Sequence, residues 1–256
     1  MKRMKLTIAA LSIALTAGIA PVANAMTFSE LYVLGDSLSD TGNIFTLFGE
    51  PAPPYFDGNF SNGPVWAEIL ADGLGLPLVP SFNVGGTNYA IGGALTGTAP
   101  LGFGMTSQAA NLLTLSGGTL PSDALYAIWG GGNDVLNSTS DVIGDPGNLA
   151  QDGPGNIAAI VENLAMAGAT TFLIPNLPDI GATPETGGDP DTIELWSGLT
   201  DTFNNELAQV LADLQADPML DITIYSLDVF SILNAFLLNP DGLNTTDQCY
   251  VDADNV

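Results

Sequence analysis

The sequence predicts an α/β fold: a doubly wound, mostly parallel sheet of about five strands with helices on both faces. Short apolar runs alternate along the chain with longer segments of helical periodicity. The short runs are apolar almost throughout, which is typical of strands covered on both faces. A strand, helix, strand order that repeats in this way implies parallel strands joined by right-handed crossovers.

Five runs are predicted to be the strands. They are residues 31–34, 88–91, 125–129, 171–174 and 222–226. In folds of this class, ligands bind at the carboxyl ends of the strands. The residues that directly follow each run are therefore the first places to search for a functional site.

Five segments between and after these strands are predicted to be helices. They are residues 64–72, 107–115, 156–167, 199–215 and 229–238. Pro64 suits the first position of the first helix, and Gly168 suits the left-handed residue that ends the third. Residues 144–155 and 184–190 are predicted to be loops. No internal repeat or linker divides the chain, so we expect one domain over residues 26–256.

The composition agrees with a globular domain and excludes one class of partner. The chain has 256 residues, of which 46% are hydrophobic and 12% charged, and this is not the composition of a disordered segment. It carries 28 acidic residues against three basic ones, with a net charge of -25. A body with no cation in its domain cannot release counterions from a phosphate backbone, so we exclude nucleic-acid binding.

Residues 1–25 are predicted to be a signal peptide. Lys2, Arg3 and Lys5 form its basic start, residues 6–20 its apolar stretch and residues 23–25 (ANA) its cleavage site. The apolar stretch is shorter than the about 20 residues that span a bilayer. We therefore expect a secreted or periplasmic protein with no integral membrane segment after cleavage.

Three motifs follow predicted strands. Residues 35–43 (GDSLSDTGN) place Ser37 in a strand-to-helix turn, where a hydroxyl is exposed and backbone N–H groups are free to bind an anion. Residues 88–94 (NYAIGGA) offer a backbone N–H at Gly93, and residues 129–134 (WGGGND) offer the side-chain amide of Asn133. Each motif alone is at least as well explained by a structural role: the first as a turn, the second as a bulge and the third as a helix cap. Their order at three successive strand ends favours an acyl-transfer site, because neutral donors stabilise charge that develops on a carbonyl oxygen.

These three motifs resemble the GDSL family of esterases and lipases, also called SGNH hydrolases. Residues 53–64 (PPYFDGNFSNGP) and 176–181 (NLPDIG) are similar to its secreted bacterial phospholipase-like branch. The similarity runs from about residue 31 to residue 249. It implies a flavodoxin-like SGNH hydrolase fold that here lacks its C-terminal helix.

The resemblance also implies a reaction and its residues. Ser37 is expected to be the nucleophile of an esterase or lipase, with an oxyanion hole made by Ser37, Gly93 and Asn133. Asp36 and Gly131 are expected to support this site. The implied substrate is a small-molecule or lipid carboxylic ester, and the family's chemistry needs no metal or organic cofactor. Protein partners are unknown. The apolar walls of the substrate pocket are expected from aromatic residues of two loops: Phe45, Phe48, Tyr55, Phe56 and Phe103.

The chain departs from the family pattern in having no histidine. The family's Asp-x-x-His block has no counterpart, and serine is a weak nucleophile without a base. We therefore expect the domain to be C-terminally truncated and, as it stands, nearly inactive. Cys249 is the only cysteine of the chain. It lies where relatives of this branch often have the first cysteine of a disulfide, so the resemblance implies that its partner is missing from this sequence.

Two other classes are kept as alternatives. A degenerate hydrolase fold could serve as an acidic surface or calcium-binding protein, using clusters such as Asp189, Asp191, Asp252 and Asp254. More remotely, Asp40-Thr41-Gly42 spells the aspartic-protease triplet. That chemistry requires two such aspartates, and the chain has one such triplet.

Overall fold

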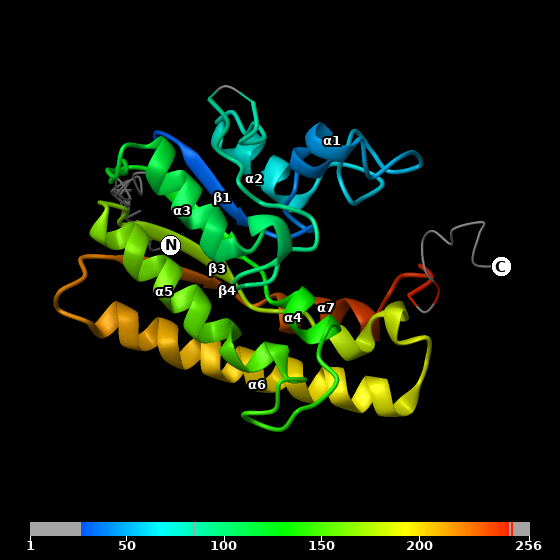
Figure 1. Cartoon of the computed structure of the whole chain (residues 1–256). Coiled ribbons are helices and arrows are strands. Elements are labelled where there is room, and N and C mark those ends of the chain that lie inside the picture. The colour runs from blue at the N-terminus through cyan, green and yellow to red at the C-terminus, as the bar shows by residue number, and fades with distance from the viewer. Residues whose placement is uncertain (1–26, 84, 246, 248–256) are drawn as a thin grey trace, which may run out of the picture.

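Four parallel strands form the central sheet of the computed structural model, which describes residues 27–83, 85–245 and 247. The strands are β1 (Leu31–Gly35), β2 (Leu125–Trp129), β3 (Thr171–Pro175) and β4 (Thr223–Leu227), in the order β1-β2-β3-β4 (Figure 1). The predicted α/β class with a doubly wound parallel sheet is confirmed. The predicted signal peptide and Cys249 lie outside the described residues.

The fifth predicted strand, residues 88–91, is not a regular strand. It forms an isolated parallel bridge, in which Asn88 pairs with Val33 of β1. The N–H of Tyr89 donates to the carbonyl of Val33, and that of Ile91 donates to the carbonyl of Gly35. The side chain of Asn88 accepts from the N–H of Ala90, a local turn that interrupts the ladder.

This segment nevertheless extends the sheet beyond β1. The spatial order therefore starts at residues 88–91, passes through β1 and continues to β4, as in flavodoxin-like sheets. The chain moves outward to one side of β1 and then returns to its other side as β2. The switch point lies between β1 and β2, and the crevice outside their carboxyl ends is the expected ligand site in such sheets.

Helices cover both faces of the sheet. On one face, α3 (Met105–Leu115), α5 (Gly153–Met166) and α6 (Pro190–Ala216) bury the larger core. On the other, α2 (Trp66–Leu74) covers a smaller core that includes Leu31, Val33 and Ala127. The last helix, α7 (Val229–Leu238), follows β4 and has no fully buried residue.

Several predicted boundaries are wrong. Helix α2 begins at Trp66 rather than Pro64, since the Glu68 carboxylate accepts the N–H of Val65 and fixes the helix start there. Helix α6 begins at Pro190, because Asp189 accepts the N–H of Thr192 as an N-cap. Residues 144–155, predicted to be a loop, contain a 3-10 turn at Leu149–Asp152 and the first turn of α5.

Short helical elements were not predicted. Helices α1 (Asn43–Phe48) and α4 (Gly132–Leu136) are too short to show helical periodicity. Three further 3-10 turns lie at Pro100–Gly102, Ile180–Ala182 and Pro184–Thr186. Both α1 and α4 follow the ends of strands that border the switch point.

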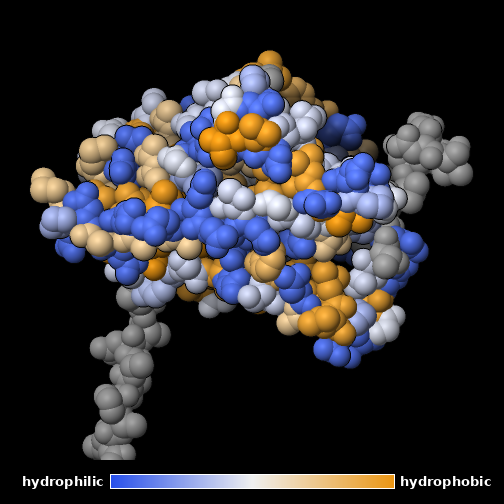
Figure 2. All heavy atoms as spheres, turned by 90° about the horizontal axis from the view of Figure 1, so that it is seen from below, coloured by the Kyte–Doolittle hydropathy of each residue, from blue (hydrophilic) through white to orange (hydrophobic). Residues whose placement is uncertain are grey.

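The face of the molecule seen from below carries no extended apolar band. In Figure 2, small hydrophobic patches alternate with hydrophilic residues on the face seen from below. In the part of the chain that the structure describes, no helix combines the length and the hydrophobicity that crossing a bilayer requires.

Candidate active site at the carboxyl edge of the sheet

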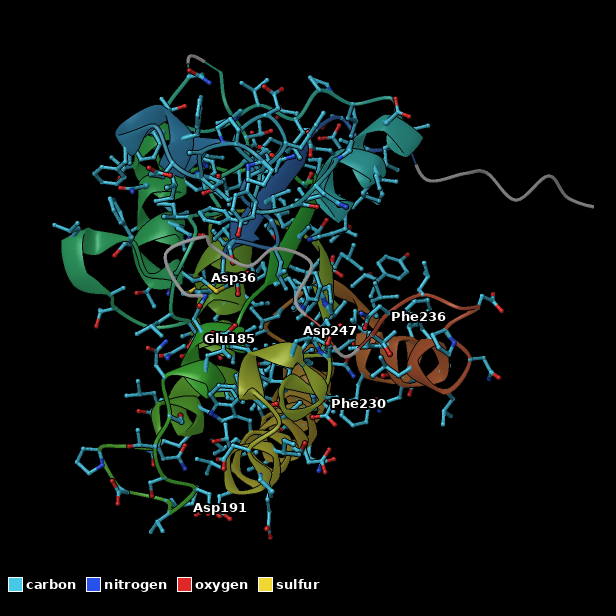
Figure 3. The ribbon with its side chains drawn as sticks, turned by 90° about the vertical axis from the view of Figure 1, so that its right-hand side faces the viewer. Asp36, Glu185, Asp191, Phe230, Phe236 and Asp247 are labelled. Carbon is cyan, nitrogen blue, oxygen red and sulfur yellow. The ribbon has the colours of Figure 1, made fainter. Side chains whose placement is uncertain are left out.

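The strands β1 and β2 end side by side, because Gly35 and Trp129 are paired at the last position of their register. Figure 3 looks at the molecule from the side on which the strands end and places Asp36 near the middle of this edge. The motifs at residues 35–43, 88–94 and 129–134 all lie along it.

Asp36 accepts the hydrogen bonds that form the turn after β1. Its carbonyl accepts the N–H groups of Ser39 and Asp40, and its side chain accepts that of Leu38 at 3.0 Å. Ser37 lies at the apex of the turn and is partly exposed. Among the described residues, neither the hydroxyl nor the backbone N–H of Ser37 has a hydrogen-bond partner. Both groups are therefore available to a ligand.

Gly93 presents a second free donor. Its φ of 77° lies in the left-handed region, and a Cβ at this position would meet no atom within 4 Å. The constraint at Gly93 is thus conformational rather than steric, which favours glycine. Within the described residues, no acceptor bonds its N–H.

Asn133 lies in the first turn of α4, with its side chain directed to the second motif. Its Nδ2 donates to the carbonyl of Ala94 at 3.1 Å. The neighbouring Asp134 accepts the N–H of Thr96 at 3.0 Å and its hydroxyl at 2.6 Å. Two successive residues of α4 therefore hold the chain that follows Gly93. Since an amide nitrogen carries two protons, Asn133 keeps one beyond its bond to Ala94.

Contacts also join the first motif to the other two. The carboxylate of Asp40 accepts the N–H of Gly92 at 2.9 Å. A Cβ added to Gly132 would lie 3.9 Å from Oδ2 of Asp36, so the turn after β1 borders the start of α4. The structure thus brings the segments that carry Ser37, Gly93 and Asn133 together at one edge.

Gly131 supports this arrangement through its backbone. Its φ is 114°, and a Cβ there would lie 2.3 Å from the ring of Phe203 in α6. A side chain at this position would thus be strained and would push α4 away from α6.

Three buried carboxyl groups, those of Asp36, Asp40 and Asp134, lie at this edge, and residues 6–256 contain no basic side chain to pair with them. Burial, with a smaller contribution from the nearby Asp134, raises the pKa of Asp36 to about 7, against the opposing hydrogen bond from Leu38. Burial also raises the pKa of Asp134 to about 6, although its bonds from Thr96 lower it. Asp36 nevertheless does not replace the missing base, because no hydrogen bond joins its carboxyl group to the Ser37 hydroxyl.

The expected aromatic residues lie at the surface rather than in the core. Phe45, Phe48 and Phe56 are 45%, 58% and 44% exposed. The rings of Phe48 and Phe103 meet edge to face at 6.1 Å, which joins the two loops that the sequence assigned to the pocket wall. Tyr55 makes a similar contact with Phe60 at 6.2 Å.

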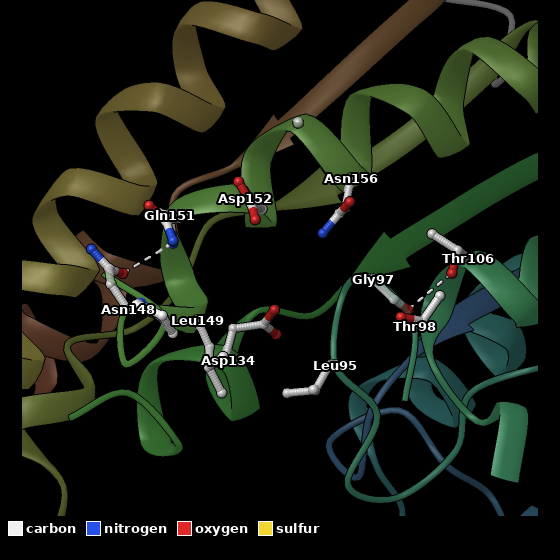
Figure 4. A pocket seen from close by; sticks show the side chains of 12 residues that line it. Leu95, Gly97, Thr98, Thr106, Asp134, Asn148, Leu149, Gln151, Asp152 and Asn156 are labelled. Atoms are coloured by element: carbon white, nitrogen blue, oxygen red, sulfur yellow. Dashed lines mark hydrogen bonds between the residues drawn. The ribbon is translucent and has the colours of Figure 1, made fainter. Parts of the chain in front are cut away.

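A polar cavity was not anticipated from the sequence. It has a volume of about 720 Å³ and lies beside Asp134, between residues 95–106 and 146–156 (Figure 4). Its walls carry hydroxyls, amides such as that of Asn156, and the two carboxylates of Asp134 and Asp152. Its residues come from loops and helix starts without a shared motif, so no sequence signal marks them as neighbours.

Two of the residues named for the alternatives, Asp189 and Asp40, have structural roles. Asp189 is the N-cap of α6, and Asp252 and Asp254 lie outside the described residues. Over residues 27–83, 85–245 and 247, no group of three or more acidic, histidine or cysteine side chains is arranged to hold a metal ion. Asp40 is fully buried and bonded to backbone N–H groups, and the parallel α/β sheet differs from the all-β architecture of aspartic proteases.

Comparison with known proteins places these motifs in a family. The model of the GDSL-like lipase/acylhydrolase family matches residues 31–251. Lipase 1 of Photorhabdus luminescens is 30% identical over 81% of this chain and 30% of its own length. The phosphatidylcholine-sterol acyltransferase of Aeromonas hydrophila is 28% identical over 78% of this chain and 59% of its own length. Esterase EstA of Pseudomonas aeruginosa is 30% identical over 86% of this chain and 38% of its own length. The chain thus spans between about a third and three fifths of the length of these relatives.

Proposed function

Because this chain belongs to the GDSL-like lipase/acylhydrolase family, we propose that it hydrolyses carboxylic esters through an acyl-enzyme on Ser37. The observation that carries the proposal is the set of free donors at one sheet edge. The N–H groups of Ser37 and Gly93 have no acceptor among the described residues, and Asn133 has one amide proton to spare.

The proposed reaction uses these groups in order. Ser37 Oγ attacks the ester carbonyl carbon, and the electron pair of the carbonyl bond moves onto its oxygen. That oxygen receives hydrogen bonds from the N–H of Ser37, the N–H of Gly93 and the amide of Asn133. The carbonyl then re-forms as the bond to the leaving oxygen breaks, and that oxygen takes up the proton that the base received from Ser37 and departs as the alcohol. Water then releases the acid by the same steps.

The base for this reaction is not among the 256 residues. A proton must leave Ser37 as it attacks, and the histidine that serves this purpose in the family has no counterpart here. We therefore propose that this chain on its own is a slow enzyme. Donors and binding alone retain about 10³ to 10⁴ over water in a well-studied serine hydrolase.

The proposed substrate is an ester with an apolar acyl or aryl group. The exposed aromatic side chains of Phe45, Phe48 and Phe56 offer contact area to such a group. The names of the relatives, which include a lipase and a phosphatidylcholine-sterol acyltransferase, support lipid esters as the class to test first.

Export is the proposed location, on the strength of the predicted leader at residues 1–25. Mass spectrometry of the protein expressed in a Gram-negative bacterium would test it. A periplasmic or extracellular chain that begins at Met26 is expected. A cytoplasmic chain that keeps the leader would contradict it.

Rescue by imidazole tests the proposed function. Hydrolysis of a p-nitrophenyl ester is measured for the wild-type chain and for Ser37→Ala, with and without imidazole. Imidazole is expected to raise the hydrolysis rate more in the presence of the wild-type chain than in buffer alone. With Ser37→Ala, the rate should equal that in buffer alone. Equal rates in the two proteins at every imidazole concentration would overturn the proposal.

A further inference from the structure

We propose that Asp40 is a positioning residue, whose carboxylate holds Gly92 and Gly93 at a fixed distance from the turn that carries Ser37. This inference rests on the proposed function and adds a residue to it. Sequence reasoning assigned Asp40 no role in ester hydrolysis.

The carboxylate of Asp40 accepts four backbone N–H groups. Its Oδ1 accepts those of Gly42 at 2.9 Å and Asn43 at 2.6 Å. Its Oδ2 accepts those of Ile44 at 3.2 Å and Gly92 at 2.9 Å. Three of these donors belong to the same turn as Asp40, whereas Gly92 belongs to the motif of the second oxyanion donor.

Among the contacts between the first motif and this segment, the one with Gly92 is the nearest to Gly93. Further back along the same segment, Ile91 donates to Gly35, and the side chain of Asn88 donates to the carbonyl of Ser39. Asp40 itself is three residues from Ser37, and Gly92 is one residue from Gly93. The carboxylate of Asp40 therefore links the turn of the nucleophile to the segment of the donor, in addition to the bonds that Asn43 and Asn88 make.

This link requires the charged form of the side chain. Asp40 has no exposed surface, and residues 6–256 contain no lysine, arginine or histidine to pair with it. All four partners are donors, so a protonated carboxyl group would find no acceptor among them. Burial raises the pKa of Asp40, and the hydrogen bonds from these four N–H groups oppose that effect.

Asp40→Asn changes this bond with little change in shape. If the amide oxygen keeps Gly42 and Asn43, the amide nitrogen faces Gly92 and Ile44, and all three are donors. Gly92 would then be released, and Gly93 would lose its fixed place. Removing one oxyanion donor costs a well-studied protease about 10² to 10³ in rate, so displacing one should cost a fraction of that factor.

The experiment is the kinetics of Ser37 labelling by an alkyl fluorophosphonate in imidazole buffer. The maximal labelling rate and the half-saturating reagent concentration are measured separately. For Asp40→Asn, we expect the maximal rate to fall about tenfold or more and the half-saturating concentration to stay within about twofold. This split separates loss of the donor geometry from loss of binding.

Two control variants exclude a general loss of folding. Asp189→Asn makes the same chemical change at the N-cap of α6, where the carboxylate bonds Thr192 and no residue of the three motifs. Leu214→Ala removes a buried side chain at the far end of α6. Both should be labelled at the wild-type rate. A folded Asp40→Asn protein labelled as fast as the controls would overturn the inference.

Amide hydrogen exchange gives a readout that does not depend on activity. In Asp40→Asn, the Gly92 N–H should exchange at least about tenfold faster, while the amides of α5 and β3 keep their protection. Unchanged exchange at Gly92 would overturn the positioning role. Failure of the wild-type chain to be labelled at Ser37 would instead overturn the proposed function and leave the exchange result to decide on Asp40.

Discussion

The side-chain amide of Asn133 donates to the carbonyl of Ala94 at 3.1 Å and so joins the start of α4 to the residue after Gly93. This bond orients the amide and leaves its second proton for a ligand. The second and third motifs, far apart in the sequence, thereby become parts of one site.

Replacing Asn133 with alanine should remove a donor and the link to Ala94 together. We expect the rate of ester hydrolysis in imidazole to fall about 10² to 10³ fold, because a removed oxyanion donor has that effect. Asn163→Ala, at an exposed position of α5, is the control. A fall of less than about threefold in the folded variant would show that Asn133 is not a donor in the reaction.

Gly131→Ala should destabilise the fold. The new Cβ would require a residue other than glycine at a φ of 114° and would collide with the ring of Phe203. We expect a loss of more than about 2 kcal/mol in the free energy of unfolding, measured by urea denaturation. Gly155→Ala is the matched control, since its Cβ would meet nothing within 4 Å in α5, and should raise stability by about 0.5–1 kcal/mol. Equal stability of the two variants would be inconsistent with the packing described.

Stability should rise as the pH falls from 8 to 5. Burial raises the pKa of Asp36 to about 7 and that of Asp134 to about 6, both above the usual value of 3.8. Between the unfolded value of 3.8 and the raised values in the folded state, the folded protein binds more protons than the unfolded protein. Acidification through this pH range therefore stabilises the folded state. The pKa values of Asp189 and Asp228 are lowered by hydrogen bonds, so their opposite effect lies below this range.

Urea denaturation at several pH values checks this sign. Asp36→Asn should reduce the gain on acidification, because the variant has no titrating group at that position. A wild-type protein that loses stability steadily between pH 8 and pH 5 would contradict the assignment.

Salt should stabilise this protein. Its net charge is -25, and residues 6–256 contain no basic side chain, so no ion pair between side chains forms in that range. Added sodium chloride screens the mutual repulsion of the carboxylates. The melting temperature is expected to rise between 10 mM and 500 mM sodium chloride, and a flat or falling curve would speak against this balance of charges.

The regular part of the fold could be predicted from the sequence because its signals are local. β2 is apolar throughout, and α7 is itself a clearly delimited apolar segment. Both elements match the predicted ranges. The segment at 88–91 could not be assigned correctly, since the turn made by the Asn88 side chain interrupts its pairing. Helix α6 was predicted too short, although Asp189 and Pro190 are the usual cap and first residue of a helix.

The candidate site could be predicted only as three separate motifs. Ser37, Gly93 and Asn133 each follow a predicted strand, and the parallel sheet explains why they share an edge. The bonds from Gly92 to Asp40 and from Asn133 to Ala94 could not be predicted, because they depend on side-chain directions in the folded chain. The polar cavity beside Asp134 could not be predicted for the same reason, because it is formed by side chains that come together only in the folded chain.

The most direct test of the account is a crystal structure of the fluorophosphonate adduct of Ser37. The phosphoryl oxygen of this adduct occupies the place of the carbonyl oxygen in the reaction. The account predicts that this oxygen lies within hydrogen-bond distance of the N–H of Ser37, the N–H of Gly93 and Nδ2 of Asn133. An adduct whose phosphoryl oxygen faces solvent, or a reagent attached to any other residue, would contradict it.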